Sequence, residues 1–248
     1  MTAIFTIFSA MLWLCHSVYV LAETSLIATA ANFLPTMQQL VDDFEAQTPH
    51  KINLSVASSG KLYGQITNGA PFDAFFSADQ NMPKRLIAEN LAMRASRFTY
   101  ASGRLVIYTN LAELMPLSPD ILSFTKLKVG QIAIANPQLA PYGIAAIEAL
   151  KNLNLAADFE GRLIYAENVA QAYQFAATGN AHYAIVSLSQ MAGLEPQNYL
   201  PLLAELHKPI LQDAVLLNHG KNNAATLEFL AYIKGQKAKD IITGFGYK

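Results

Sequence analysis

The chain has 248 residues, of which 52% are hydrophobic and 14% are charged, and its formal net charge is −1. The 17 basic and 18 acidic residues leave no basic excess of the kind found on nucleic-acid-binding surfaces, so we expect no nucleic-acid partner. The length allows one large domain or two smaller ones, and the apolar content is ample for a core.

The first 22 residues contain no charged side chain and are mostly apolar. They end in Val20-Leu21-Ala22, which has the small-residue spacing of a signal-peptidase site. We therefore predict a secretory signal over residues 1–22 and a mature chain that begins near Glu23 in the periplasm. Because the segment lacks Lys and Arg and is about long enough to span a bilayer, an uncleaved membrane anchor is the alternative. The single cysteine, Cys15, lies inside this segment.

The first part of the mature chain alternates strand patterns with helix patterns. Apolar or alternating runs predict strands, and apolar residues at helical spacing predict the helices between them. The predicted strands are 25–30, 51–56 and 71–76, and the predicted helices are 34–46, 62–66 and a third one capped by residues 77–79 that runs to about residue 90. This β-α-β-α-β-α order predicts a mainly parallel sheet with helices on both faces.

The pattern changes near residue 102, where an apolar strand at 104–109 follows without a short helical connection. This change predicts a crossover into a second lobe, and a second crossover is predicted at the strand 210–217. Between them lie strands at 131–135, 162–165 and 182–187, helices at 142–151 and 167–177, and an irregular return at 201–209; helices at 222–234 and 236–243 close the chain.

The predicted fold class is therefore α/β with two lobes, each a mainly parallel sheet flanked by helices, joined by two crossover strands. Lobe 1 is expected to be discontinuous, from residues 23–102 and 212–248, with lobe 2 (103–211) inserted. Sheets of this kind bind ligands at the carboxyl ends of their strands, so we expect the ligand between the lobes.

Four strand-to-helix junctions share the same chemistry, two of them in each predicted lobe. They are Ala31-Asn32, Ser58-Ser59, Pro141-Tyr142-Gly143 and Asn168-Val169. Each can present backbone N–H groups at a helix N-terminus, and Asn32, Ser58 and Ser59 add side-chain donors. Taken alone, each junction is more often an ordinary helix cap. Together, these neutral donors suit a small oxyanion, the nearest charges being Lys61 and Glu167.

Lys61 follows Ser-Ser-Gly, which raises the question of a nucleotide-binding P-loop. That motif needs Gly where Ser55 stands and Ser or Thr where Leu62 stands, so the hypothesis is rejected.

Several peptides carry a resemblance to a known family. They are Ile27–Phe33, Val56–Tyr63, Gly69–Asp79, Ala135-Asn136-Pro137 with Pro141-Tyr142-Gly143, Ala166–Val169 and Gly244-Phe245-Gly246-Tyr247. In this order they resemble the periplasmic molybdate-binding proteins of ABC transporters, and the similarity covers essentially the whole mature chain.

The resemblance implies a two-lobed protein that holds molybdate or tungstate as a tetrahedral dianion between its lobes. The implied ligand contacts are Ala31, Asn32, Ser58, Ser59, Tyr142 and Val169. Hydroxyl donation is implied for the serines and backbone N–H donation for Tyr142 and Val169. No protein atom is expected to bind molybdenum directly and no cofactor is expected. The implied protein is a periplasmic monomer that delivers the anion to a membrane permease.

The chain departs from the family pattern at two of its positions. Many members have Ser where Asn32 stands, so the donor here would be the Asn amide or the backbone. Some members have a ligand-contacting Tyr where this chain has Ser187, which leaves open whether Ser187 contacts the ligand.

Two alternatives stay open. The distant one is a secreted enzyme, but the five histidines have no metal-ligand spacing and no Gly-x-Ser-x-Gly motif is present. The other is a binding protein for sulfate, phosphate, an organic acid or ferric iron. Iron sites need clusters of Tyr and carboxylates, which the four junctions lack.

Overall fold

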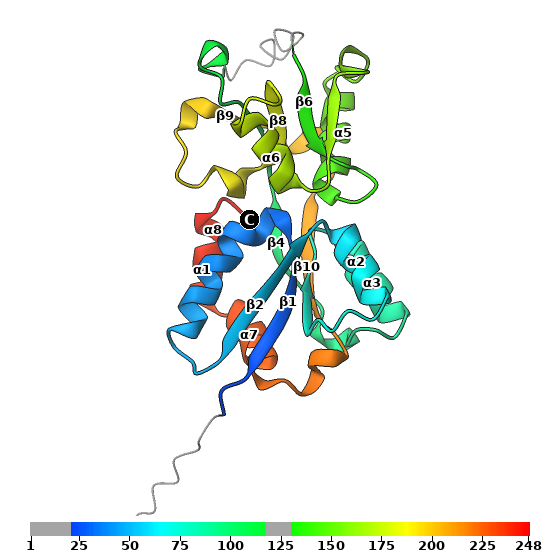
Figure 1. Cartoon of the computed structure of the whole chain (residues 1–248), viewed down its shortest axis with the longest axis vertical. Helices are drawn as coiled ribbons and strands as arrows, with labels where there is room; N and C mark the ends of the chain where they lie inside the picture. The colour runs from blue at the N-terminus through cyan, green and yellow to red at the C-terminus, as the bar shows by residue number, and fades with distance from the viewer. Residues whose placement is uncertain (1–20, 118–129) are drawn as a thin grey trace, which may run out of the picture.

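The computed structural model describes residues 21–117 and 130–248. Except for its last two residues, the predicted secretory signal (1–22) lies outside this part. Figure 1 shows two lobes stacked along the long axis, each built around one five-stranded sheet. Within the described residues, no helix has both the length and the apolar character needed to cross a membrane.

The lower sheet has the strand order β2-β1-β3-β10-β4. Its strands are β1 (Thr24–Ala30), β2 (Lys51–Ala57), β3 (Ala74–Phe76), β4 (Phe98–Gly103) and β10 (Ile210–Leu216). Strand β1 runs parallel to β2 and β3, whereas β10 is antiparallel to both β3 and β4. Four strands therefore share one direction, and the return strand β10 opposes them.

Helices cover both faces of the lower sheet because its central strands are buried on both sides. Neighbouring residues of β1 point to opposite faces, so Ile27 packs with Phe33 and Met37, whereas Ala28 packs with Leu62. The first face is covered by α1 (Leu34–Glu45), α7 (Ala224–Ile233) and α8 (Gln236–Gly244), and the second by α2 (Ser59–Thr67) and α3 (Asn81–Ala88).

The upper sheet has the order β7-β6-β8-β5-β9. Its elements are β5 (Leu105–Tyr108), β6 (Ile132–Ala135), α5 (Pro141–Asn152), β7 (Leu163–Ala166), α6 (Val169–Ala177), β8 (Tyr183–Ser187) and β9 (Tyr199–Pro201). Strand β6 is parallel to β7 and β8, and β5 is antiparallel to β8 and β9. A single core cluster joins this sheet to α5 and α6.

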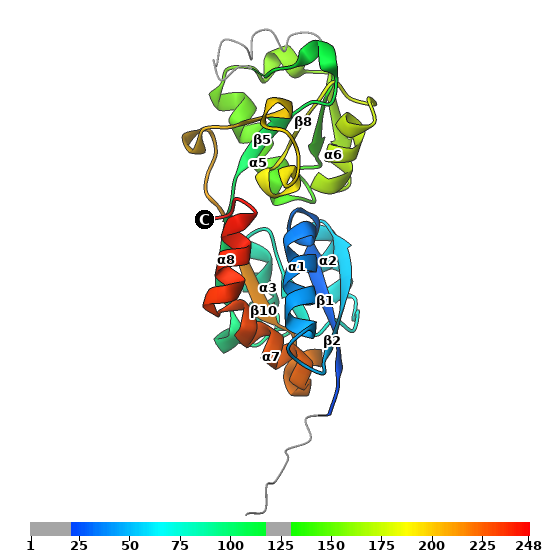
Figure 2. The ribbon, with the colours of Figure 1, turned by 90° about the vertical axis from the view of Figure 1, so that its left-hand side faces the viewer.

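Two connections join the lobes. The chain leaves the lower sheet at the end of β4 and enters the upper sheet with β5, and it returns between β9 and β10. In the perpendicular view of Figure 2, the C-terminal end lies where the two lobes meet. There Lys248 exchanges two backbone hydrogen bonds with Ser102 of β4, at 2.7 and 3.1 Å.

The two-lobed α/β fold predicted from the sequence is confirmed, with differences in detail. Strands β4 and β9 were not predicted. The strand predicted at 71–76 is only Ala74–Phe76, because Pro71 has no N–H and the Phe72 N–H bonds locally to the Ala70 carbonyl at 2.9 Å. The predicted alternation in β2 holds at Ile52, which is 6% exposed, but not at Val56, which is 37% exposed at the end of this edge strand.

Candidate ligand site between the two lobes

A small cavity lies where the carboxyl ends of the parallel strands of both lobes meet. It encloses about 200 Å³, including its opening to solvent. Its walls come from the four junctions and three other residues, namely Ala30, Ala31, Asn32, Ser58, Ser59, Ala78, Ala140, Pro141, Tyr142, Asn168 and Val169. All six residues predicted to contact the ligand are in this set, and no Asp, Glu, Lys, Arg or His is.

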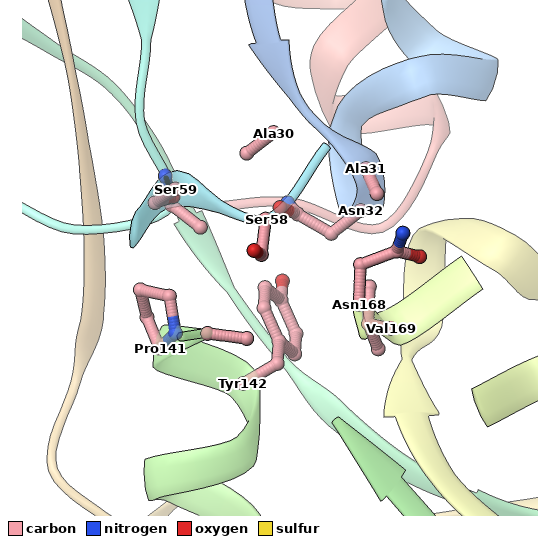
Figure 3. Close-up of a pocket in the computed structure, with 11 residues that line it drawn as sticks. Ala30, Ala31, Asn32, Ser58, Ser59, Pro141, Tyr142, Asn168 and Val169 are labelled. Carbon is pink, nitrogen blue, oxygen red and sulfur yellow. Dashed lines mark hydrogen bonds between the residues drawn. The ribbon is translucent and has the colours of Figure 1, made fainter. Parts of the chain in front are cut away.

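Ser58 presents an unused hydroxyl to the cavity (Figure 3). It occupies the N-cap position of α2, yet its side chain makes no capping hydrogen bond. Within the described residues, its Oγ is buried without any hydrogen-bond partner. Asn168, at the N-cap of α6, behaves in the ordinary way and accepts from the Gln171 N–H at 3.0 Å. Ser58 is therefore the N-cap residue of α2 by position, but its side chain does not cap the helix.

Ser59, the first residue of α2, has a hydroxyl whose orientation is set by its neighbour. Its Oγ accepts a hydrogen bond from the Ala78 N–H at 2.9 Å. Because that bond occupies a lone pair, the hydroxyl hydrogen is left to donate in another direction. Ser58 and Ser59 are 4% and 1% exposed, so both hydroxyls are shielded from bulk water.

Three helix N-termini add backbone donors to the same cavity. Ser59 and Val169 are the first residues of α2 and α6, and Tyr142 is the second residue of α5. N–H groups in the first turn have no partner within their helix, and the helix dipole places positive charge there. The cavity therefore attracts an anion without any charged side chain.

The side-chain amide of Asn32 is directed to protein groups. Its Nδ2 donates to Gln212 Oε1 and to the Tyr247 hydroxyl, both at 2.9 Å. Both amide hydrogens are thus used. Of the two donors that the sequence left open for Asn32, the backbone N–H is the one available to a ligand.

The Tyr142 hydroxyl is held from behind the cavity. It accepts hydrogen bonds from Ser187 Oγ at 2.9 Å and from Gln212 Nε2 at 3.2 Å. Burial raises the pKa of Tyr142 well above its ordinary value of 10.0, so this wall stays neutral at physiological pH. Ser187 is not in the cavity lining, and its side chain supports Tyr142.

Behind the cavity lies a buried polar group that we call the hinge cluster. Its members join the two lobes through hydrogen bonds between uncharged side chains, and they are Asn32, Tyr100, Tyr142, Ser187, Ser189, Gln212 and Tyr247. No side-chain role was predicted for Gln212, Ser189 or Tyr247. Of these, only Tyr247 carried a signal, since it belongs to the Gly-Phe-Gly-Tyr peptide of the resemblance.

The lobes also contact each other directly around the cavity. Ser189 Oγ donates to the Asn32 carbonyl at 2.7 Å, and the Gly60 N–H donates to the Leu139 carbonyl at 2.9 Å. Lys61 and Glu167, the charges named from the sequence, form an ion pair with Nζ and Oε2 3.3 Å apart. Their side chains are 50% and 64% exposed, so this pair lies outside the cavity.

Known proteins with similar sequences and structures include periplasmic molybdate-binding proteins. The family of bacterial extracellular solute-binding proteins matches residues 26–248. The molybdate-binding protein ModA of Azotobacter vinelandii is 39% identical over 224 residues, covering 89% of this chain and 88% of that protein. The ModA of Rhodobacter capsulatus is 39% identical over 220 residues, covering 89% and 86%. The structure of the Azotobacter vinelandii periplasmic molybdate-binding protein matches with a TM-score of 0.83 at 37% identity, covering 90% of this chain and 98% of that one.

Proposed function

The chain belongs to the bacterial extracellular solute-binding proteins, and we propose that it captures molybdate or tungstate between its lobes and delivers the anion to the membrane permease of an ABC transporter. The likeness to two molybdate-binding proteins at 39% identity supports this choice of ligand. The proposal includes a periplasmic, monomeric protein without enzymatic activity or cofactor.

The observation that carries the proposal is the Ser58 hydroxyl. A buried hydroxyl that makes no hydrogen bond costs roughly 1–3 kcal/mol. Thr29 and Thr36 also have such hydroxyls within the described residues, but of the three only Ser58 lines the cavity. Ser58 Oγ is buried without a partner within the described residues, and it lines a cavity that also receives three helix N-termini. An anion with several acceptor oxygens satisfies the hydroxyl and the N–H groups at once.

Neutral donors suit a fully ionised tetrahedral dianion. Ser58, Ser59 and the Asn32 backbone would donate from the lower lobe, and the N–H groups of Tyr142 and Val169 from the upper lobe. These donors stabilise the two negative charges through dipoles that the fold has already oriented, so no cationic side chain is required. Molybdate and tungstate have nearly the same size and no proton at neutral pH, so the site accepts either one.

Capture of the anion requires hydrogen-bond donors from both lobes, so binding is coupled to closure of the lobes. Only a closed form makes both sets of bonds, so the anion favours that form. The bodies that move would be residues 23–102 with 212–248 and residues 103–211. The hinge would be formed by the two crossovers, near 102–104 and 210–212.

Other oxyanions would be excluded for different reasons. Hydrogen phosphate carries an O–H that needs an acceptor when it is buried. The nearest carboxylate, Glu167, is paired with Lys61 outside the cavity, so the lining offers no carboxylate for that proton. Sulfate has no proton, so it is excluded by size, because a smaller tetrahedron does not reach donors spaced for longer metal–oxygen bonds.

A melting experiment on the purified mature chain tests the proposal. A ligand held by the native state alone raises Tm according to how far its concentration exceeds Kd. At equal concentrations, molybdate and tungstate are expected to give large shifts of similar size. Phosphate and sulfate are expected to give small shifts or none. An equal or larger shift with phosphate contradicts the neutral-donor site, and one with sulfate contradicts the exclusion by size.

A further inference from the structure

The lobes touch through backbone atoms directly beside the cavity. Gly60, the second residue of α2 in the lower lobe, donates its N–H to the Leu139 carbonyl of the upper lobe at 2.9 Å. Ser59 immediately precedes Gly60, and Leu139 lies just before Ala140 and Pro141, which line the cavity. The separation of Gly60 and Leu139 therefore sets how far apart the donors of the two lobes lie.

Position 60 has no room for a side chain in this arrangement. A Cβ there would lie 2.8 Å from the Leu139 oxygen and 3.2 and 3.3 Å from the Leu139 Cα and carbonyl carbon. Those neighbours are backbone atoms, which cannot rotate aside as the end of a flexible side chain does. A side chain at position 60 would have to move one lobe away from the other.

The upper side of this contact is braced against movement. Leu139 belongs to a tight turn in which the N–H groups of Leu139 and Ala140 both donate to the Asn136 carbonyl, at 3.0 and 2.9 Å. The Gln138 N–H donates to Asn136 Oδ1 at 2.9 Å. The helix that follows packs closely against the end of β6 and this turn, since a Cβ on Gly143 would fall 2.1 Å from the Ala135 oxygen and 2.9 Å from the Pro137 nitrogen.

The lower side is fixed as well. The Leu62 N–H donates to the Ser58 carbonyl at 3.0 Å, which closes the first turn of α2 around Gly60. Leu62 is fully buried beneath that turn, and Ser59 Oγ is held by the Ala78 N–H. A second lobe-to-lobe contact, from Ser189 Oγ to the Asn32 carbonyl at 2.7 Å, fixes the separation at another cavity residue.

We propose that the Gly60–Leu139 backbone contact is the stop that ends lobe closure and fixes the width of the anion cavity. Glycine is needed at position 60 because any side chain would halt closure earlier. This inference rests on the proposed function and adds a reason for its size selectivity. A sulfate ion cannot draw the lobes closer to reach its shorter bonds, because the two backbones already meet.

The test compares two glycines of the same helix. A Cβ at Gly64, one turn after Gly60, would meet nothing within 4 Å, and neither glycine has a positive φ. Alanine favours helix more than glycine does at both sites, so neither Gly60→Ala nor Gly64→Ala is expected to lower Tm in the absence of anion. By calorimetric titration, Gly60→Ala is expected to weaken molybdate and tungstate binding together, by on the order of tenfold or more. Gly64→Ala is expected to bind both anions as the wild type does.

The proposal would be overturned if Gly60→Ala bound molybdate with an affinity within about twofold of the wild-type value. Such a difference in the free energy of binding is under 0.5 kcal/mol. A second measurement does not depend on any variant. In the wild type, hydrogen exchange at the Gly60 amide, followed by NMR, should slow when molybdate is added. An unchanged exchange rate at saturating molybdate would also overturn it. If the wild type binds sulfate and not molybdate, the proposed function is wrong, and the same glycine comparison is made with sulfate.

Discussion

The cavity and the hinge cluster meet at Asn32 and Tyr142, and both are built from uncharged polar groups, yet they use hydrogen bonds in opposite ways. On the cavity side, Ser58 Oγ has no partner within the described residues. On the cluster side, Gln212 alone bonds to Asn32, Tyr100 and Tyr142. The difference separates two tasks. The unpaired hydroxyl of Ser58 faces the cavity, and the groups paired with one another join the two lobes.

The tyrosines of the cluster show why pairing is needed there. Tyr100, Tyr142 and Tyr247 are all buried, and burial is the largest cause that raises the pKa of each hydroxyl. They therefore stay neutral and act as hydrogen-bonding groups. A tyrosinate in this position would be negatively charged and would repel a dianion in the cavity, so a neutral cluster is compatible with the proposed anion site.

We expect the largest effect on stability from Gln212→Ala, which removes hydrogen bonds within the hinge cluster. Gln212 is fully buried, and its loss removes one hydrogen bond each from Asn32, Tyr100 and Tyr142 and creates a cavity. We expect the free energy of unfolding to fall by about 2–4 kcal/mol. Urea unfolding without anion measures it. The control is Gln39→Ala on the exposed surface of α1, and a Gln212 variant as stable as this control would show that the cluster does not join the lobes.

Ser58→Ala tests the cavity side, and we expect it to lower the affinity for molybdate without lowering the stability of the fold. The variant removes a donor to a buried anion, which is worth about 1.5–3 kcal/mol, or roughly a ten- to hundredfold loss of molybdate affinity. Because Ser58 Oγ bonds to no described protein atom and an unpaired buried hydroxyl is costly, the free energy of unfolding without anion is expected to stay unchanged or to rise. Calorimetric titration and urea unfolding measure the two quantities.

Ser187→Ala is the matched control for Ser58→Ala. Ser187 is also a buried serine, but its Oγ donates to the Tyr142 hydroxyl and contacts Ser189 Oγ at 2.8 Å. Its loss is expected to lower the free energy of unfolding by about 1 kcal/mol or more. If Ser58→Ala destabilises the chain without anion as much as Ser187→Ala does, the distinction between unpaired and paired groups is lost.

The sequence predicted the cavity better than it predicted the cluster, for a physical reason. Each cavity residue stands at a strand-to-helix junction, and a junction is a local pattern of residue types. The cluster depends on contacts between distant parts of the chain, such as Asn32 with Gln212, 180 positions apart, and Asn32 with Ser189, 157 apart. Nothing local marks Gln212, which lies in a strand whose other residues are mostly buried apolar ones.

The same limit applies to the details of the fold. Strand β9 is three residues long and holds a proline, so it has too little pattern to be recognised, and only its pairing with β5 defines it. The sequence named Lys61 and Glu167 as the nearest charges, but not their ion pair, because they are 106 positions apart. The Gly60–Leu139 contact was equally invisible, since it joins backbone atoms.

We expect the smallest effect on molybdate affinity from a substitution of Lys61. This variant tests whether Lys61 lies outside the set of residues that contact the anion. Lys61 follows Gly60 in α2, so a model in which charge holds the anion would make it a principal contact. In the structure its Nζ is paired with Glu167 Oε2, and both side chains are at least half exposed. Exposed pairs of this kind are worth about 0–1 kcal/mol, so Lys61→Ala is expected to weaken molybdate binding by less than about fivefold.

What remains of the Lys61 effect should come from long-range electrostatics. Without its partner, the Glu167 carboxylate would repel an arriving dianion, and salt screens such a repulsion over about 10 Å at 0.1 M ionic strength. The loss of molybdate affinity in Lys61→Ala should therefore shrink as salt is added. The loss of affinity in Ser58→Ala, whose side chain lies inside the cavity, should persist. Lys84→Ala removes the same charge from an exposed lysine of α3 in the lower lobe and is expected to leave affinity unchanged. If Lys61→Ala costs more affinity than Ser58→Ala at high salt, charge holds the anion and the neutral-donor description of the site is wrong.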